Sequence, residues 1–331
     1  MIKSIEKYQT IGIVGLAKNT GKTTTLNYLI ELYKHEPLGL TSIGLDGEAI
    51  DQVNYLPKPR IDCYEKMVVA TAKECLDESS IEYEVLEETN ALTALGKVII
   101  VRVISSGRVM LAGPTTNLEM NMIVHQMKKY VSRIFVDGAL SRMTFSALEG
   151  LDGIILASGA SFHQEMSETL SKTKHVINLF MYPKTRIDIS PNASYILSNG
   201  DEIIASDKKS YASLRLALEQ VKESLKWLYV RGAITDRFLD MVVDLRLSSF
   251  TLIVEDPTKL LYHYRLASVI EKLKIQIEVL KTCKLFMITV NPYRPVGRSY
   301  DPDVFLKEVK KLTSIPIINV KSLEDKDGNK T

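Results

Sequence analysis

Short apolar runs alternate with segments of helical spacing in the first part of the chain. Residues 10–14 form an apolar run, and a glycine-bearing turn separates it from residues 23–33, where the apolar positions share one helical face. A second apolar run covers residues 38–45 and ends at Asp46-Gly47-Glu48. This order predicts a strand, a turn, a helix and a second strand.

The pattern changes between residues 57 and 114. Alternating or β-branched runs recur there with turns between them, at residues 67–72, 81–86, 97–105 and 108–112. This texture is typical of an antiparallel ladder. We therefore expect an antiparallel β insertion at about 57–114, packed beside the main sheet.

After the insertion, the sequence again contains short apolar runs that are typical of buried strands. A helix is predicted around residues 118–130, with Gly113-Pro114-Thr115-Thr116 before it as the expected cap. Strands are predicted at 133–136, 153–157 and 175–180. Strands that alternate with helices predict an α/β fold with a doubly wound, mostly parallel sheet.

A second set of elements follows residue 190. The spacing predicts an amphipathic helix over 211–225, and apolar runs predict strands at 250–254, 275–280, 285–290 and 316–320. Asp256-Pro257 and Asp301-Pro302 are expected to begin helices. We divide the chain into residues 1–190, which carry the insertion, and a C-terminal α/β region over 191–331 that can be continuous with the first.

Composition narrows the possible partners and compartments. Lys and Arg number 42 against 40 Asp and Glu, without a long basic block, so we expect neither a nucleic-acid nor a membrane partner. The three cysteines are few and widely spaced, as expected of reduced thiols. The beginning of the sequence lacks the order of a signal peptide, and no run of 18 uncharged apolar residues occurs. We expect a cytoplasmic protein.

The turn after the first strand has the composition of a phosphate loop. Gly15 and Gly21 allow backbone N–H groups to turn inward around an anion, and the helix that follows presents its N-terminus. Lys22 can reach β- and γ-phosphates, and the Thr23 hydroxyl can ligate Mg²⁺. The alternative is a glycine turn with an incidental Lys-Thr pair. The expected nucleotide contacts are Gly15, Lys18, Asn19, Thr20, Gly21, Lys22, Thr23 and Thr24.

Two carboxylates follow predicted strands and are candidates to support ATP hydrolysis and Mg²⁺. Asp137 ends the strand over 133–136, and Asp46 ends the strand over 38–45. Each precedes a glycine, so a turn-forming Asp-Gly is the alternative for both. We predict Lys22, Asp137 and Asp46 as catalytic residues, and Thr23, Asp137 and Asp46 as Mg²⁺ ligands.

Two features of the sequence favour adenine as the base of the bound nucleotide: a guanine-binding segment is missing, and one residue can contact adenine. The Asn/Thr-Lys-x-Asp segment that reads guanine in many GTPases does not occur, which favours ATP. Asn291, at the end of the strand over 285–290, can meet an adenine amine, although a strand-ending turn is the alternative. The five histidines stand far apart and match no metal-binding spacing.

The spacing of the loop resembles one branch of the P-loop proteins. Five residues separate Gly15 from Gly21, as in the G-x5-G-K-T order of dethiobiotin synthetase and cobyric acid synthase. Partition ATPases, an adjoining group, place a loop lysine across a dimer. Lys18 is a candidate for that role but lies one position away, so it acts either across a homodimer or within its own chain.

Four segments together are similar to a narrower family. GLAKNTGKTTTLN at 15–27, LTSIGLDGE at 40–48, LAGPT at 111–115 and VDGALSR at 136–142 resemble the small P-loop subunit of reactivating factors for adenosylcobalamin-dependent aminomutases, such as lysine 5,6-aminomutase or ornithine aminomutase. The resemblance implies a larger partner subunit of actin-like fold. The pair would use ATP to release damaged cobalamin from the inactivated aminomutase.

Two other functions stay open. A ligase like dethiobiotin synthetase would phosphorylate the carboxylate of a small molecule and turn over without a protein partner. A partition-type ATPase would dimerise and carry a membrane-targeting helix or a DNA-binding patch, and the sequence shows neither clearly.

Overall fold

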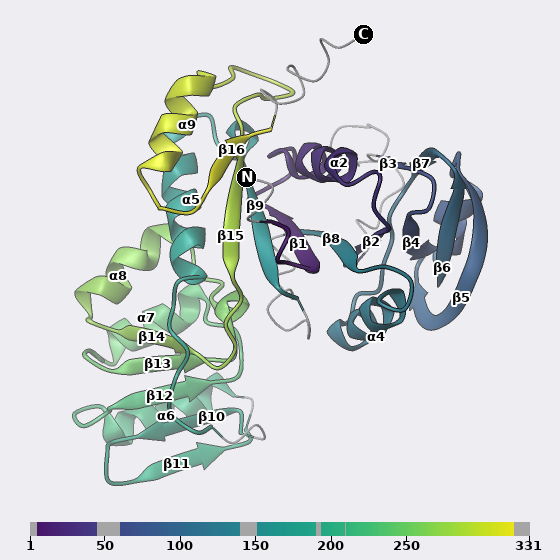
Figure 1. The fold of residues 1–331 in the computed structure, drawn as a ribbon. Coiled ribbons are helices and arrows are strands. Elements are labelled where there is room, and N and C mark those ends of the chain that lie inside the picture. The colour runs from purple at the N-terminus through teal and green to yellow at the C-terminus, as the bar shows by residue number, and fades with distance from the viewer. Residues whose placement is uncertain (1–4, 45–59, 140–150, 190–192, 209, 321–331) are drawn as a thin grey trace. The chain divides into compact units, whose positions relative to one another are not determined.

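The computed structural model describes residues 5–44, 60–139, 151–189, 193–208 and 210–320 (Figure 1). The chain divides into two compact units, one of Met1–Leu170 with Lys284–Thr331 and one of Ser171–Cys283. This partition differs from the expected division at 190. The last two predicted strands pair with strands of the first unit, so the chain returns to that unit after residue 283.

A single large sheet forms the first unit. Among the described residues it has nine strands, in the order β16 (Ile317–Asn319), β15 (Leu285–Asn291), β9 (Gly153–Gly159), β1 (Thr10–Gly15), β8 (Arg133–Ala139), β2 (Leu38–Ser42), β4 (Val68–Ala72), β6 (Gly96–Ser105) and β5 (Glu82–Thr93). Every pairing from β16 to β4 is parallel, and the pairings β4–β6 and β6–β5 are antiparallel. The prediction of an α/β fold with a mostly parallel sheet is confirmed.

The inserted strands extend this sheet instead of packing beside it. β4 pairs in parallel with β2 through Gly39–Val68 and Leu40–Val69, and β6 and β5 then add antiparallel strands at the edge. β3 (Ile61–Cys63) and β7 (Gly107–Val109) form a separate two-stranded ribbon. The turn texture between residues 57 and 114 predicted the antiparallel strands, but it carried no information about which edge they would join.

Three helices of the first unit agree with the sequence pattern. α2 (Lys22–Leu32) follows β1, and its buried Leu26, Leu29 and Ile30 join the core of the sheet with Ile11 and Ile13. α4 (Asn117–Met127) begins after Thr116, whose side chain accepts a hydrogen bond from the Glu119 N–H. α9 (Pro302–Lys310) begins after Asp301, which accepts from two backbone N–H groups. Both caps were predicted.

The predicted strand over residues 175–180 is wrong. Residues 175–179 belong to helix α5 (Met166–Leu179), which follows a 3₁₀ turn, η3 (Ala160–Phe162), and Phe180 lies in the turn after the helix. The apolar run from 175 is short, and short runs do not distinguish a strand from a buried helix. The helical period becomes visible only when upstream threonines are counted, because Thr169, Thr173, Val176 and Phe180 are all buried at spacings of three or four.

The second unit contains a smaller sheet with helices between its strands. The strand order is β11 (Ile203–Ser206), β10 (Tyr195–Ser198), β12 (Trp227–Val230), β13 (Thr251–Val254) and β14 (Gln276–Val279). The last three are parallel, and β10 is antiparallel to both of its neighbours. The helices are α6 (Tyr211–Val221), α7 (Asp236–Asp244) and α8 (Ala267–Lys272).

The helix predicted from amphipathic spacing in this unit is present as α6, with Leu214, Leu218 and Val221 buried. The helix expected after Asp256-Pro257 is limited to a 3₁₀ turn, η4 (Pro257–Lys259). A second 3₁₀ turn, η5 (Tyr264–Leu266), leads directly into α8. Across both units, no helix in the described part of the chain is long and apolar enough to cross a membrane.

α5 and the segment before η5 bury a histidine in the second unit. His175 is 5% exposed and meets the ring of Tyr262 edge-on, with 5.1 Å between ring centroids. Burial lowers the pKa of His175 to about 4, and the charges of Lys172 and His263 act in the same direction. The folded protein therefore keeps this imidazole neutral.

We expect stability to fall as the pH is lowered from about 6.5 toward about 4. In that range the unfolded chain binds a proton at His175 and the folded chain does not, so acid favours unfolding, by on the order of 3 kcal/mol at the lower limit. Urea unfolding at a series of pH values measures this. His175→Phe should flatten the profile, whereas His125→Gln, at an exposed histidine of α4, should leave it unchanged. Identical profiles for all three proteins would contradict the assignment.

Candidate functional site

The predicted phosphate loop lies at the carboxyl edge of the parallel strands. β1 ends at Gly15, which pairs with Ala139 of β8 on one side and Ala157 of β9 on the other. On the far side of β9, Gly159 pairs with Asn291 at the end of β15. Ligands of open α/β sheets bind outside the carboxyl ends of the strands. The loop Gly15–Thr23 occupies this position.

The backbone of the loop leaves the N-terminus of α2 uncapped by a side chain. Gly21 is the N-cap residue, with φ at 98°, and Asn19 also has a positive φ of 59°. The first turn contains no acidic residue. The first N–H groups of a helix have no partner within the helix, and they carry partial positive charge. This end of α2 can therefore receive an anion.

Hydrogen bonds hold the loop from within and from β9. The Thr20 hydroxyl donates to the Ala17 carbonyl at 2.8 Å, and Thr20 is 1% exposed. The Leu16 N–H donates to the Ala157 carbonyl at 3.0 Å, which anchors the beginning of the loop to the neighbouring strand. The buried Thr25 hydroxyl donates to the Gly21 carbonyl at 2.9 Å. These contacts fix the loop shape.

Glycines allow the loop to approach the ends of β9 and β15. A Cβ on Gly159 would lie 2.7 Å from the Thr20 carbonyl oxygen and 3.0 Å from the Asn291 carbonyl oxygen. A Cβ on Gly21 would lie 2.8 Å from the Cβ of Asn291. Three segments that are distant in sequence thus meet at van der Waals distance. No side chain fits between them.

Lys22 and Asp137 form the charged centre of the site. The Lys22 Nζ lies 3.1 Å from the Asp137 Oδ2, and the two side chains are 22% and 17% exposed. The pair joins the first turn of α2 to β8 beside the end of β1. Ion pairs that water reaches stabilise a fold by only ~0–1 kcal/mol, so an arriving anion can draw the ammonium group from the carboxylate at little cost.

The segments that carried the family resemblance meet at the same edge. The Ile43 N–H donates to the Asp137 carbonyl at 2.8 Å, and the Gly44 N–H donates to the Pro114 carbonyl at 2.7 Å. A Cβ on Gly113 would lie 1.7 Å from the Ser42 carbonyl oxygen, so this position accepts only glycine. The ends of β2 and β8 and the segment 111–115 are therefore packed together beside Asp137.

The structure brings together most, but not all, of the predicted site residues. Lys18 and Asn19 are exposed at the tip of the loop, and Thr23 and Thr24 are half-buried in the first turn of α2. Asp46 lies outside the described residues. Within the described ranges, no group of three or more His, Cys, Asp or Glu side chains forms a metal site. Of the three predicted Mg²⁺ ligands, the structure describes Thr23 and Asp137.

Asn291 contacts the loop, and its own side chain forms a turn. The Asn291 Oδ1 accepts a hydrogen bond from the Tyr293 N–H at 3.2 Å, in agreement with the strand-ending alternative. The residue is 9% exposed and packs on Gly21. Its contact with an adenine stays a prediction.

Two residues that support the loop, Gly159 and Thr289, were not predicted from the sequence. Gly159 supports Thr20 from the end of β9, and the Thr25 hydroxyl lies 2.7 Å from the Thr289 hydroxyl of β15. The run of small residues Ser158-Gly159-Ala160 at the end of an apolar strand could have indicated the close contact at Gly159. The second depends on β15 joining this sheet, which no local pattern indicates.

Comparisons with protein-family models, with curated proteins and with solved structures give no match for this chain. The site is therefore interpreted from its own geometry. An uncapped helix N-terminus, a lysine in its first turn and a carboxylate at the end of the adjacent strand can together bind a phosphate and a divalent cation beside it.

We expect Gly159→Ala to destabilise the first unit by about 1–3 kcal/mol, because the new methyl group would meet backbone atoms of Thr20 and Asn291 that cannot move independently. Gly232→Ala is the matched control, since no described heavy atom lies within 4 Å of its Cβ position, and it should change stability by less than ~0.5 kcal/mol. Urea unfolding compares the two variants. Equal effects would show that the contact at Gly159 does not constrain the loop.

Proposed function

We propose that the chain is a P-loop ATPase that binds ATP and Mg²⁺ at the Gly15–Thr23 loop. The observation that carries this proposal is the position of the Lys22 ammonium, 3.1 Å from Asp137, at the uncapped N-terminus of α2. Few arrangements other than phosphate binding use a lysine, a helix N-terminus and a strand-end carboxylate together.

Each residue has a defined part in this proposal. The backbone N–H groups of the loop and of the first turn of α2 hold the phosphates, with Lys18 and Asn19 at the exposed rim. Lys22 leaves Asp137 and binds the β- and γ-phosphate oxygens. Thr23, Asp137 and Asp46 would hold Mg²⁺, which supplies positive charge against the phosphates. With Lys22 on the phosphates, Asp137 would be available to hold the metal ion and its water.

We further propose that ATP hydrolysis drives a change in a partner protein. The four segments that resemble the small subunit of aminomutase reactivating factors include the loop and the segments packed at Asp137. On this basis the partners are a larger subunit of actin-like fold and an adenosylcobalamin-dependent aminomutase, in the cytoplasm. A nucleotide can drive such remodelling only when one nucleotide state binds the partner more tightly than the other.

We expect Lys22→Ala to abolish measurable ATP binding, because it removes the point charge that meets the phosphates. Asp137→Asn should instead preserve binding within a few-fold and lower Mg²⁺-dependent hydrolysis at least tenfold, since the loop backbone still holds the phosphates. Titration calorimetry measures binding, and phosphate release measures hydrolysis.

Lys128→Ala, at the exposed end of α4, serves as the charge-matched control and should bind ATP as the unmodified protein does. All variants should remain folded, with a free energy of unfolding within ~1 kcal/mol of that of the parent, because water still reaches both side chains of the ion pair. ATP affinity retained by Lys22→Ala would exclude the loop as the nucleotide site.

The proposed cellular role predicts recovery of an inactivated aminomutase. An aminomutase inactivated during turnover should regain activity when it receives ATP, Mg²⁺, fresh adenosylcobalamin, the larger subunit and this protein. Recovery should fail with Lys22→Ala, because the nucleotide then cannot shift the affinity of the chain for its partner. Enzyme activity before and after the addition is the measurement.

The main control is a mixture without this chain. Full recovery of aminomutase activity in that mixture would contradict the proposed reactivating role. Conversion of a free metabolite by this chain and ATP alone would assign it to the ligase class instead. An ATP-dependent homodimer that binds neither partner would assign it to the partition-type class and would place Lys18 at the dimer contact.

A further inference from the structure

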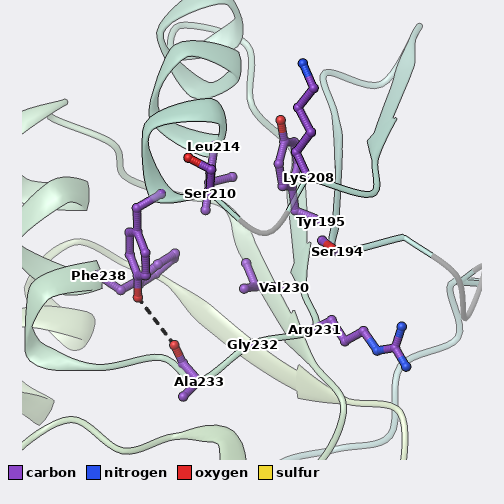
Figure 2. A pocket seen from close by; sticks show the side chains of 11 residues that line it. Ser194, Tyr195, Lys208, Ser210, Leu214, Val230, Arg231, Gly232, Ala233 and Phe238 are labelled. Carbon is purple, nitrogen blue, oxygen red and sulfur yellow. Dashed lines mark hydrogen bonds between the residues drawn. The ribbon is translucent and has the colours of Figure 1, made fainter.

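A cavity of about 330 Å³ lies within the second unit, at the carboxyl end of β12 (Figure 2). All residues that line it belong to Ser171–Cys283, so it is separate from the Gly15–Thr23 loop. Its volume is at the lower end of the ~300–1,000 Å³ typical of small-molecule sites. A ligand with one or two rings fits a cavity of this size.

The walls of the cavity are aromatic and aliphatic, and hydrogen bonds hold both tyrosines. The Tyr195 hydroxyl on β10 bonds with the Ser213 hydroxyl on α6 at 2.8 Å. The Tyr211 hydroxyl donates to the Ala233 carbonyl at 3.4 Å, so its ring spans from α6 to the β12–α7 connection. Leu214, Val230 and Phe238 are buried and supply the apolar floor. Such walls favour a flat, apolar ring.

One position in the wall has no side chain. Gly232 lines the cavity, and no described heavy atom lies within 4 Å of where its Cβ would be. Its backbone does not adopt a positive φ, so a larger residue is not strained there. Gly232 is exposed, so a side chain placed at this position would stand in open space at the rim of the cavity. A large side chain at this position should therefore crowd the mouth of the cavity.

The charge around the cavity is positive. Lys208 and Arg231 are exposed at its edge, the lining contains no carboxylate, and neither cation forms an ion pair within the described part of the chain. Two carboxylates lie near the lining in sequence: Asp207 directly precedes Lys208 and is exposed, and Asp236 accepts a hydrogen bond from the His263 N–H at 2.6 Å. α6 begins at the cavity with Ser210 as its N-cap, which adds partial positive charge. A cleft lined by one sign of charge attracts the opposite sign.

We propose that this cavity, the Tyr195–Tyr211 pocket, binds a small planar ring that carries an anionic group. The ring lies against the tyrosines and Val230, and the anion meets Lys208, Arg231 and the beginning of α6. This site is independent of the proposed ATP site and adds a second ligand to the protein.

Phenyl phosphate is the probe, and benzylammonium, which has the same ring with the opposite charge, is its comparison. Ligand-observed NMR titrations should give phenyl phosphate at least tenfold tighter binding than benzylammonium. Gly232→Leu should weaken the binding of phenyl phosphate at least tenfold by crowding the mouth of the cavity. The double variant Lys208→Gln/Arg231→Gln should weaken it at least fivefold and change the binding of neutral benzyl alcohol less than twofold.

Two matched controls separate this site from other positive charges. Lys226→Gln, at the amino end of β12, and Lys128→Gln, at the exposed end of α4 in the first unit, should each change phenyl phosphate binding less than twofold when ATP is present in excess. Equal binding of both charged probes, unchanged binding to Gly232→Leu, or loss of binding in Lys128→Gln would each overturn the proposal. If Gly232→Leu fails to fold, the double variant Lys208→Gln/Arg231→Gln alone tests whether the cavity binds the anionic ring. None of these results depends on whether the chain hydrolyses ATP.

Discussion

The close packing of the Gly15–Thr23 loop on the ends of β9 and β15, with glycine at positions 21 and 159, is the constraint on which the first unit depends. Thr20 rests on Gly159, Gly21 rests on Asn291, and a methyl group at either glycine would meet an atom at less than 3 Å. The loop can keep its shape only if β15 lies beside β9. The chain therefore has to return to the first sheet after Cys283, and the second unit is inserted before that return.

The same edge of the sheet explains why Asp137 is a suitable partner for Lys22. β8 lies between β1 and β2, and Asp137 is opposite Ile13 on one strand and Ser42 on the other. Its backbone carbonyl is used by the Ile43 N–H, so the main chain is held while the side chain is turned toward Lys22. A carboxylate positioned in this way can exchange a lysine for a metal ion without a change in the strands.

Local patterns predicted the elements that carry their own signals, and failed where distant contacts decide. The β1–α2 segment has a strand, two glycines and a helical period within 25 residues, so its local fold was predictable. The strand predicted at 175–180 failed because its apolar run is shorter than the helix around it. The contributions of Gly159 and Thr289 depend on β9 and β15 pairing with each other over more than 100 residues of sequence, and no local pattern specifies such a pairing.

Both candidate sites attract anions in a chain whose charges nearly cancel, with 42 basic and 40 acidic residues. Long-range attraction is therefore weak, and each site has to create its positive field locally. The first does so with the backbone of a helix N-terminus and one lysine that a carboxylate holds in place until a ligand arrives. The second places two exposed cations around an aromatic cavity. On these proposals the first arrangement recognises phosphate through fixed dipoles and one lysine, whereas the second requires a planar ring as well as an anionic group.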